Sequence, residues 1–463
     1  MKTLININNL MRIDTHNHSH YSNFRLIDAI SKPRDMILTA HKLGLKGLAL
    51  TDHETVAGHI EWLQLEKELK QKELIPQDFK CILGNEIYLT DTREHAQTYY
   101  HYILLAKDTK GAEQLRKLSS TAWINSYTYK KMERVPTLKS ELEEIVKKEP
   151  GHLIAQTACL GGELANLVLE LVAAEKKKDE DYIYEVKSKI NDFILWNISL
   201  FKDDFYIEIA PSAAPDQIIF NERVRSIAEA YNLKIVPACD SHYLLGKDRY
   251  VHKAYLQSKK GEREVDEYYS YAHMMDNEEC FQNLAVANYT EEDFKILCEN
   301  TMEIASKIGT YNLFHNPIIP EVEVKDYEKI DFSMSNYSTL KYLFSSDNIQ
   351  ERYWVNECWK GLKEKEISFN NFEKYVKRLE KEADIIKTVG DKLGNCLFSY
   401  FNTFQHYIDL FWECGSISGP GRGSSVCFLS NYLLGITQLD PIEWDLMEWR
   451  FLNKERLELP ECI

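Results

Sequence analysis

Seven short runs of β-branched and aliphatic residues predict strands in the first half of the chain. Stretches of apolar residues at helical spacing lie between them, and such alternation is typical of parallel strands joined by crossover helices. Seven strands suit a closed barrel better than an open sheet. The expected strands are 11–14, 47–50, 81–89, 102–106, 153–157, 205–209 and 234–237.

The expected helices divide into two groups with different character. Those between the strands are 35–43, 56–69, 112–122, 138–148, 162–176 and 217–231. Beyond about residue 270 come a helical pattern at 291–308, a proline-containing connection at 316–324, two charged amphipathic helices at 347–365 and 372–389, and an aromatic stretch at 398–412. We therefore place a domain boundary near residue 270, which gives domains 1–270 and 271–463.

Composition narrows the class of protein. The 463 residues include 56 Lys and Arg against 72 Asp and Glu, so the net charge is −16, and 44% of residues are hydrophobic. This is a globular composition, and its acidity excludes a protein that coats nucleic acid by bulk charge. The sequence contains no run of about 18 apolar residues, so it predicts no membrane-spanning helix. Ten scattered Cys without a C-x-x-C pair favour reduced thiols in a cytosol.

Candidate chemistry gathers at the ends of the expected strands. His16 and His18 follow the first strand, and Asp240 and His242 follow the seventh. In an extended segment, residues i and i+2 point the same way, so each pair presents two potential metal ligands. The second strand ends in Thr51-Asp52-His53, which adds a third histidine-bearing motif.

Three other strands each carry a ligand-type residue: Glu86, His101 and Cys159. Taken singly, a histidine near a strand end is more often a hydrogen-bonded structural residue, and a lone cysteine is usually a packing residue. Together they would meet at one face of a barrel, which is where barrel active sites lie. Imidazole and carboxylate donors, with one thiolate, suit Zn, Mn or Fe better than Mg or Ca alone.

The ordered motifs H-x-H, T-D-H, G-x-E, A-C-L-G-G-E and D-x-H resemble the polymerase and histidinol phosphatase (PHP) domain. The resemblance implies a distorted seven-stranded (βα) barrel that hydrolyses phosphoesters on two or three divalent metal ions, here Mn, Zn or Fe. It gives His53, Glu86, Asp240 and His242 the catalytic role. The implied metal ligands are His16, His18, Asp28, His53, Glu86, His101, Cys159, Asp240 and His242.

Asp28 follows a small insertion at 23–25, which makes its match to the ligand pattern less direct than the others. His20, His59 and His95 lie near the motifs but match no ligand position. We expect these three to be supporting or surface residues.

A Gly-rich turn marks the last third of the chain. Its glycines would let backbone N–H groups approach an anion, and a following helix would add its dipole; a tight turn with a surface arginine is the alternative. The series G-P-G-R-G-S, L-G-I-T, L-D-P and R-F-L-N-x-E-R resembles the start of the palm of the bacterial replicative DNA polymerase III alpha subunit. The expected fold is thus α/β, a PHP-type barrel followed by a mixed α+β, incomplete palm. The implied nucleotide-binding residues are Gly421, Arg422, Gly423, Ser424 and Arg456.

The resemblance departs from the family at the end of the sequence. The family continues with a proline and two aspartates one residue apart, which hold the polymerase metals, whereas Glu461 and Ile463 stand at those positions here. Nucleotidyl transfer needs such carboxylates. We therefore expect no polymerisation by this chain alone.

The sequence predicts the N-terminal portion of a DNA polymerase III alpha subunit, active in replication in a bacterial cytosol. A phage genome is an alternative source of the chain. The expected activity is metal-dependent 3′→5′ exonuclease hydrolysis, acting on the 3′ end of a primer or single strand. The basic and aromatic segment 127–134 could grip single-stranded DNA; a plain solvated turn is the alternative. The expected partners are DNA, a C-terminal polymerase portion and other replication proteins, with no membrane. The alternatives are a free-standing phosphatase or phosphodiesterase, and a non-catalytic scaffold stabilised by its metals.

Overall fold

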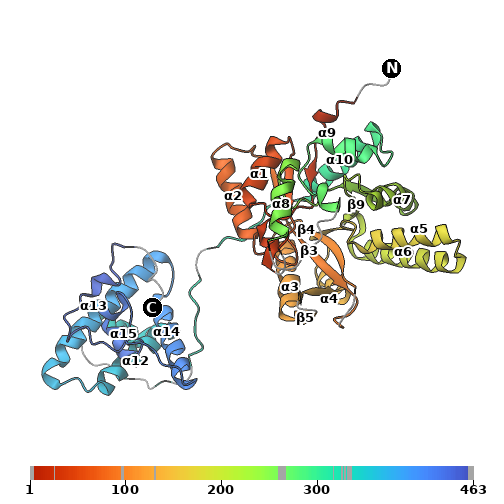
Figure 1. The fold of residues 1–463 in the computed structure, drawn as a ribbon. Coiled ribbons are helices and arrows are strands. Elements are labelled where there is room, and N and C mark those ends of the chain that lie inside the picture. Colours follow the sequence, from red (N-terminus) through yellow and green to blue (C-terminus); the bar gives the residue numbers. More distant parts are fainter. Residues whose placement is uncertain are drawn as a thin grey trace. The chain divides into compact units, whose positions relative to one another are not determined.

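The computed structural model describes residues 5–24, 27–94, 98–129, 132–258, 267–315, 318–324, 327, 330 and 336–456. The chain forms two compact units, the first ending at Phe314 and the second beginning at His315. The first unit is a nearly closed barrel with helices around it (Figure 1).

The seven expected strands are all present and follow one another around the barrel in the order β1-β2-β3-β4-β8-β9-β10. A short strand, β7 (Pro136–Leu138), also pairs with β3. Beside the barrel, β5 (Tyr127–Tyr129) and β6 (Met132–Arg134) form a separate hairpin. The barrel strands are β1 (Ile13–Asp14), β2 (Gly47–Leu50), β3 (Lys80–Thr90), β4 (Tyr100–Ala106), β8 (Leu153–Gln156), β9 (Phe205–Ile209) and β10 (Lys234–Pro237).

The expectation that all strands are parallel is wrong for β4. This strand runs antiparallel to both of its neighbours, β3 and β8. No helix is found in the described part of the connection between β3 and β4, and strands joined without a crossover helix pair antiparallel. The other adjacent barrel strands are parallel.

The barrel interior is apolar at one end and polar at the other. Alternation places Ile82 and Glu86 on the same face of β3, and Tyr206 and Glu208 on the same face of β9. Ile82 and Tyr206 belong to a buried apolar cluster, whereas Glu86 and Glu208 are fully buried carboxylates. The polar end therefore lies toward the carboxyl ends of these strands.

The helices of the first unit include the six expected between strands and the helix expected at 291–308. Three more were not expected: the 22-residue α6, α8 and α9. Helix α6 packs alongside α5 (Figure 1). The helices are α1 (Pro33–Lys42), α2 (His59–Gln71), α3 (Thr109–Ile124), α4 (Lys139–Lys148), α5 (Glu163–Lys177), α6 (Glu180–Phe201), α7 (Pro215–Tyr231), α8 (Arg249–Leu256), α9 (Asn277–Ala285) and α10 (Glu291–Lys307).

The first unit extends past the boundary expected near residue 270 because α9 and α10 pack on the barrel. Helix α10 contacts both β1 and β10, the two strands at the barrel's seam. Its Thr301 hydroxyl accepts a hydrogen bond from the backbone N–H of Ile13 at 3.2 Å. Ile304 belongs to the apolar cluster inside the barrel, so this helix completes the core.

Every regular element described in the second unit is helical, so the β component expected there is not found among its described residues. Trp354, Phe398, Phe401 and Phe428 form its core. Glu382 is fully buried and accepts hydrogen bonds from Arg378 and from the backbone N–H groups at the start of α15. The helices are α11 (Ser338–Ser345), α12 (Ile349–Glu364), α13 (Phe369–Leu393), α14 (Leu397–Glu413) and α15 (Leu429–Leu433).

A buried ion pair lies beneath the polar end of the barrel. The Arg12 guanidinium donates to Asp14 at 3.2 Å and to the Met275 carbonyl at 2.7 Å. Asp14 Oδ1 in turn accepts from the backbone N–H groups of His16 and Cys239, each at 3.3 Å. One carboxylate thus ties together the segments that follow β1 and β10.

We predict that Arg12→Met destabilises the first unit by about 3–5 kcal/mol, because the substitution leaves the Asp14 carboxylate buried and uncompensated. Urea unfolding followed by circular dichroism measures the change. Lys72→Met is the control, because Lys72 forms an exposed pair with Glu68 whose loss should cost no more than about 1 kcal/mol. Equal losses in the two variants would contradict the prediction.

Candidate metal centre

The two histidines after β1 converge with Asp240 as the sequence predicts. The Nε2 atoms of His16 and His18 lie 3.0 Å apart. Asp240 Oδ1 is 3.2 Å from the first nitrogen and 2.9 Å from the second. The segments are held in place by a parallel bridge between Asn17 and Ser241, which closes the barrel at this end.

Glu86 is the residue that joins most of the cluster. Its Oε2 lies 3.0 Å from Nε2 of His16 and of His18, and 3.2 Å from Nδ1 of His53. Its Oε1 contacts Nδ1 of His101. Glu86 is fully buried, so one carboxylate faces four imidazole rings away from bulk water.

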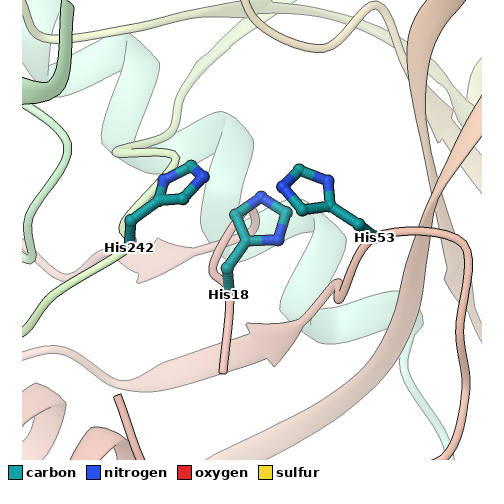
Figure 2. A group of neighbouring side chains, drawn as sticks. All are labelled: His18, His53 and His242. Atoms are coloured by element: carbon teal, nitrogen blue, oxygen red, sulfur yellow. The ribbon is translucent and has the colours of Figure 1, made fainter. Parts of the chain in front are cut away.

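A second group of ligands adjoins the first through His18. Figure 2 shows His18 between His53 and His242, with ring centroids 4.0 and 4.6 Å away, respectively. Asp28 Oδ2 lies 2.8 Å from Nε2 of His53 and 3.4 Å from Nε2 of His242. Despite the insertion before it, Asp28 therefore belongs to the cluster.

His101 and Cys159 complete the set. Cys159 Sγ is 3.6 Å from His101 Nδ1. Because β4 runs antiparallel, its amino end lies beside the carboxyl ends of its neighbours, which is why a residue near the start of a strand reaches the centre. A Cβ on Gly161 would lie 2.8 Å from the His101 ring, so only glycine fits there without a shift. The structure thus brings together every residue predicted as a metal ligand.

The backbone is strained around the ligands. Glu54 follows His53 with a φ of 56°, Ala158 precedes Cys159 with a φ of 61°, and Asp240 itself has a φ of 46°. Residues with a Cβ rarely adopt this left-handed region, which costs of order 1–3 kcal/mol each and persists where the surrounding structure imposes it. The fold therefore holds Asp240 and the neighbours of His53 and Cys159 in conformations that the local sequence does not favour.

The buried charges shift one another's pKa values. Burial alone would lower the pKa of His18, but hydrogen bonds to Asp240 and Glu86 outweigh it and raise the pKa to about 9. Burial alone would raise the pKa of Glu86, but the neighbouring His101 and His53 hold it well below its usual range. Burial would also raise the pKa of Asp240, but His16 and His242 hold that pKa well below its usual range. These shifts favour ionised carboxylates beside protonated histidines, which would release their protons when a cation binds.

The donor set and its geometry fit divalent metal ions. One ligand atom from each of His16, His18, Glu86 and Asp240 lies within 4.8 Å of the others, and His18, His53 and His242 form a second such group. Nε2 atoms of two histidines that face each other at 3.0 Å have the arrangement of ligands directed at one ion. Imidazole with carboxylate suits Zn, Mn or Fe.

Sequence reasoning missed the residue that orients His16. Glu208 on β9 is fully buried, and its Oε1 lies 2.6 Å from His16 Nδ1. A carboxylate on this nitrogen directs the opposite nitrogen, Nε2, toward the ligand cluster. The available signal was a lone carboxylate within the apolar run 205–209. Tyr269 was also missed; its hydroxyl donates to Asp28 Oδ1 at 2.9 Å.

Of the three histidines expected to be supporting or surface residues, two are described. His59 is buried and hydrogen-bonds the Gly84 carbonyl at 2.8 Å, and burial lowers its pKa to about 4. His20 is exposed. His95 lies outside the described residues. So do Lys130 and Lys131, the lysines of the basic segment 127–134, and the C-terminal residues Glu461 and Ile463.

The Gly-rich turn is described, but its role as a nucleotide site stays a prediction. Gly421 and Gly423 have φ values of 132° and 58°, a backbone that favours glycine. Arg422 and Arg456 are exposed. The apolar helix expected after the turn consists of a three-residue 3-10 helix and the five-residue α15, which is too short to contribute a large dipole.

Comparisons with known proteins agree with both halves of this description. Residues 14–212 match the PHP domain, and residues 352–462 match the bacterial DNA polymerase III alpha NTPase domain. This chain therefore carries both domains. The PHP match ends before Asp240 and His242, which the structure places in contact with candidate ligands of the matched region.

Relatives align along nearly the whole chain. It is 38% identical to the DNA-directed DNA polymerase of Bacillus phage SPbeta, covering 97% of this chain and 36% of that protein. It is 30% identical to the DNA polymerase III subunit alpha of Campylobacter jejuni, covering 96% and 35%. An amidohydrolase structure from Chromobacterium violaceum aligns at 15% identity with a TM-score of 0.30, covering 50% of this chain and 88% of that one. The chain thus spans about a third of the length of these polymerase relatives.

No helix in the described part of the chain is both long and apolar enough to cross a membrane. The nine described cysteines are free thiols.

We predict that His16→Ala and Asp240→Asn each remove most of the bound metal. Both residues belong to the same four-residue group of ligand atoms, so losing either one leaves that group incomplete. Elemental analysis of the purified variants measures the metal content. The control is His41→Ala, which removes an exposed histidine on α1. Metal content equal to that of the unchanged chain in both ligand variants would contradict the prediction.

Glu208→Gln should weaken metal binding about 10- to 100-fold, because the neutral amide orients His16 less strongly. Competition with a chromogenic chelator measures the affinity. Glu303→Gln serves as the control, since Glu303 pairs with Lys234 and Lys307 at the surface of the barrel. Unchanged affinity in Glu208→Gln would assign this carboxylate a packing role alone.

Proposed function

We propose that the metal centre hydrolyses phosphodiesters and removes nucleotides from the 3′ end of DNA. We further propose that the chain works in DNA replication as part of a DNA polymerase III alpha-type protein. The observation that carries the first proposal is the convergence of all the predicted ligand side chains at one buried centre. The polymerase relatives along the whole chain support the second.

The residues of the centre have different roles, which follow from the contacts that each one makes. Glu86 contacts histidines of both ligand groups, so it would help to hold divalent ions in either group. Asp28 Oδ2 contacts His53 and His242, whereas Asp240 Oδ1 contacts His16 and His18. Bound divalent ions would lower the pKa of a water molecule and stabilise charge on phosphate oxygens. The protein's own part is to hold the ligands fixed and to exclude bulk water from them.

We expect the purified chain, supplied with Mn²⁺, to shorten a 5′-labelled single-stranded oligonucleotide from its 3′ end. Asp240→Asn should slow this more than about 100-fold, because a metal-assisted step loses several kcal/mol of charge stabilisation with its ligand. His41→Ala should cleave at the unchanged rate. A denaturing gel followed over time shows both the direction and the rate of cleavage.

Two alternative functions give different results in the same assay. A free-standing phosphatase would turn over histidinol phosphate or an aryl phosphate and leave the oligonucleotide intact. A scaffold stabilised by its metals would contain metal by elemental analysis and hydrolyse none of these substrates. Either result would overturn the exonuclease proposal.

A further inference from the structure

His101 is the most exposed of the histidine and carboxylate ligands. The His101 side chain is 30% exposed, whereas the side chains of the other histidine and carboxylate ligands are no more than 9% exposed. Cys159, which contacts His101, is also buried. A substrate that reaches the ligands must therefore approach past His101.

Aromatic residues continue the ligand-bearing face of the β3–β4 pair beyond His101. Tyr88 pairs with His101 across the two strands and stacks on its ring, with centroids 4.8 Å apart and ring planes 15° from parallel. Tyr99 precedes His101 by two residues, so alternation directs it to the same face. Both tyrosines are only partly buried.

The β5–β6 hairpin adds a cation to these rings. The Tyr127 hydroxyl hydrogen-bonds the hydroxyl of Tyr99. The Arg134 guanidinium lies over the Tyr99 ring, 5.5 Å from its centroid, and no described residue forms an ion pair with it. Most of the other arginines described in the first unit, such as Arg93 with Glu141, are paired with carboxylates. An uncommitted guanidinium beside a phosphoesterase-type centre is placed to bind a phosphate.

We propose that Tyr99 and Arg134 form a seat for the 3′-terminal nucleotides of single-stranded DNA, with Tyr99 stacking on a base and Arg134 contacting a backbone phosphate. This inference rests on the proposed function, because it names the substrate of the same centre. Aromatic stacking with positive charge is the chemistry by which proteins hold single strands without reading their sequence. A small phosphomonoester would use neither the exposed rings nor a second phosphate contact. In a chain of net charge −16, the local cation offsets repulsion of the DNA backbone.

The test changes the protein ring and the terminal DNA base separately and asks whether the two effects depend on each other. Tyr99→Leu and Arg134→Gln are compared with Tyr184→Leu, which removes an exposed tyrosine on α6. Each is assayed with Mn²⁺ on a single-stranded oligonucleotide, on the same oligonucleotide with an abasic 3′-terminal residue, and on bis(4-nitrophenyl) phosphate. Binding is followed separately by the fluorescence of 2-aminopurine at the 3′ end, with Ca²⁺ in place of Mn²⁺.

Tyr99→Leu should raise the KM for the oligonucleotide about tenfold and abolish the preference for a terminal base over an abasic site. Arg134→Gln should raise both oligonucleotide KM values and make binding less dependent on salt. Neither should change hydrolysis of bis(4-nitrophenyl) phosphate, which carries neither a nucleobase for Tyr99 nor a second phosphate for Arg134. Equal losses of activity on all three substrates would contradict the proposed binding site. An unchanged base preference in Tyr99→Leu would also contradict it.

Failure of the proposed function has a different signature. If the unchanged chain hydrolyses none of the substrates, the exonuclease proposal fails, and the 2-aminopurine measurement still decides whether DNA binds here. The binding-site proposal is supported if the chain quenches 2-aminopurine fluorescence, if Tyr99→Leu abolishes the quenching, and if Tyr184→Leu leaves it unchanged. Absence of quenching in the unchanged chain would overturn it.

Discussion

The structure of the first unit depends on one fully buried carboxylate, Glu86, that faces four histidines. A buried ion is stable only when opposite charge or a strong hydrogen-bond donor surrounds it. The histidines come from segments far apart in the sequence, so Glu86 can be compensated only when the barrel is formed. The same requirement makes this cluster suited to cations, because a divalent ion supplies the charge that the rings would otherwise carry as protons.

Several independent contacts keep the ligand segments together. The Arg12–Asp14 pair lies below them, the Asn17–Ser241 bridge joins the two ends of the barrel, and α10 packs across the seam between β1 and β10. Asp14 accepts from the Cys239 N–H and Asn17 bridges to Ser241, so these contacts flank Asp240, whose backbone is left-handed. The centre is therefore positioned by the whole unit, and its geometry does not depend on local preferences alone.

Much of this could be predicted from the sequence, and the failures have physical causes. The strand positions follow from apolar runs, and the ligands follow from their place at strand ends. The direction of β4 could not be found in the same way, because hydrophobic periodicity reports which residues are buried and carries no information about direction. The extent of the first unit depends on how α9 and α10 pack, which is decided by contacts such as Thr301 with Ile13. Glu208 is a single polar residue in an apolar strand, and its partner His16 lies 192 residues away.

The antiparallel pairing of β3 with β4 also makes the site sensitive to strand register. Glu86 and His101 reach the same centre only because Tyr88 lies opposite His101 and Ile103 opposite Glu86. A slip of one residue would turn every side chain of β4 to the other face. His101 would then point into the apolar layer beneath the helices, and Tyr100 or Tyr102 would take its place among the ligands. An insertion within β4 should therefore damage this site far more than one in the hairpin loops around it.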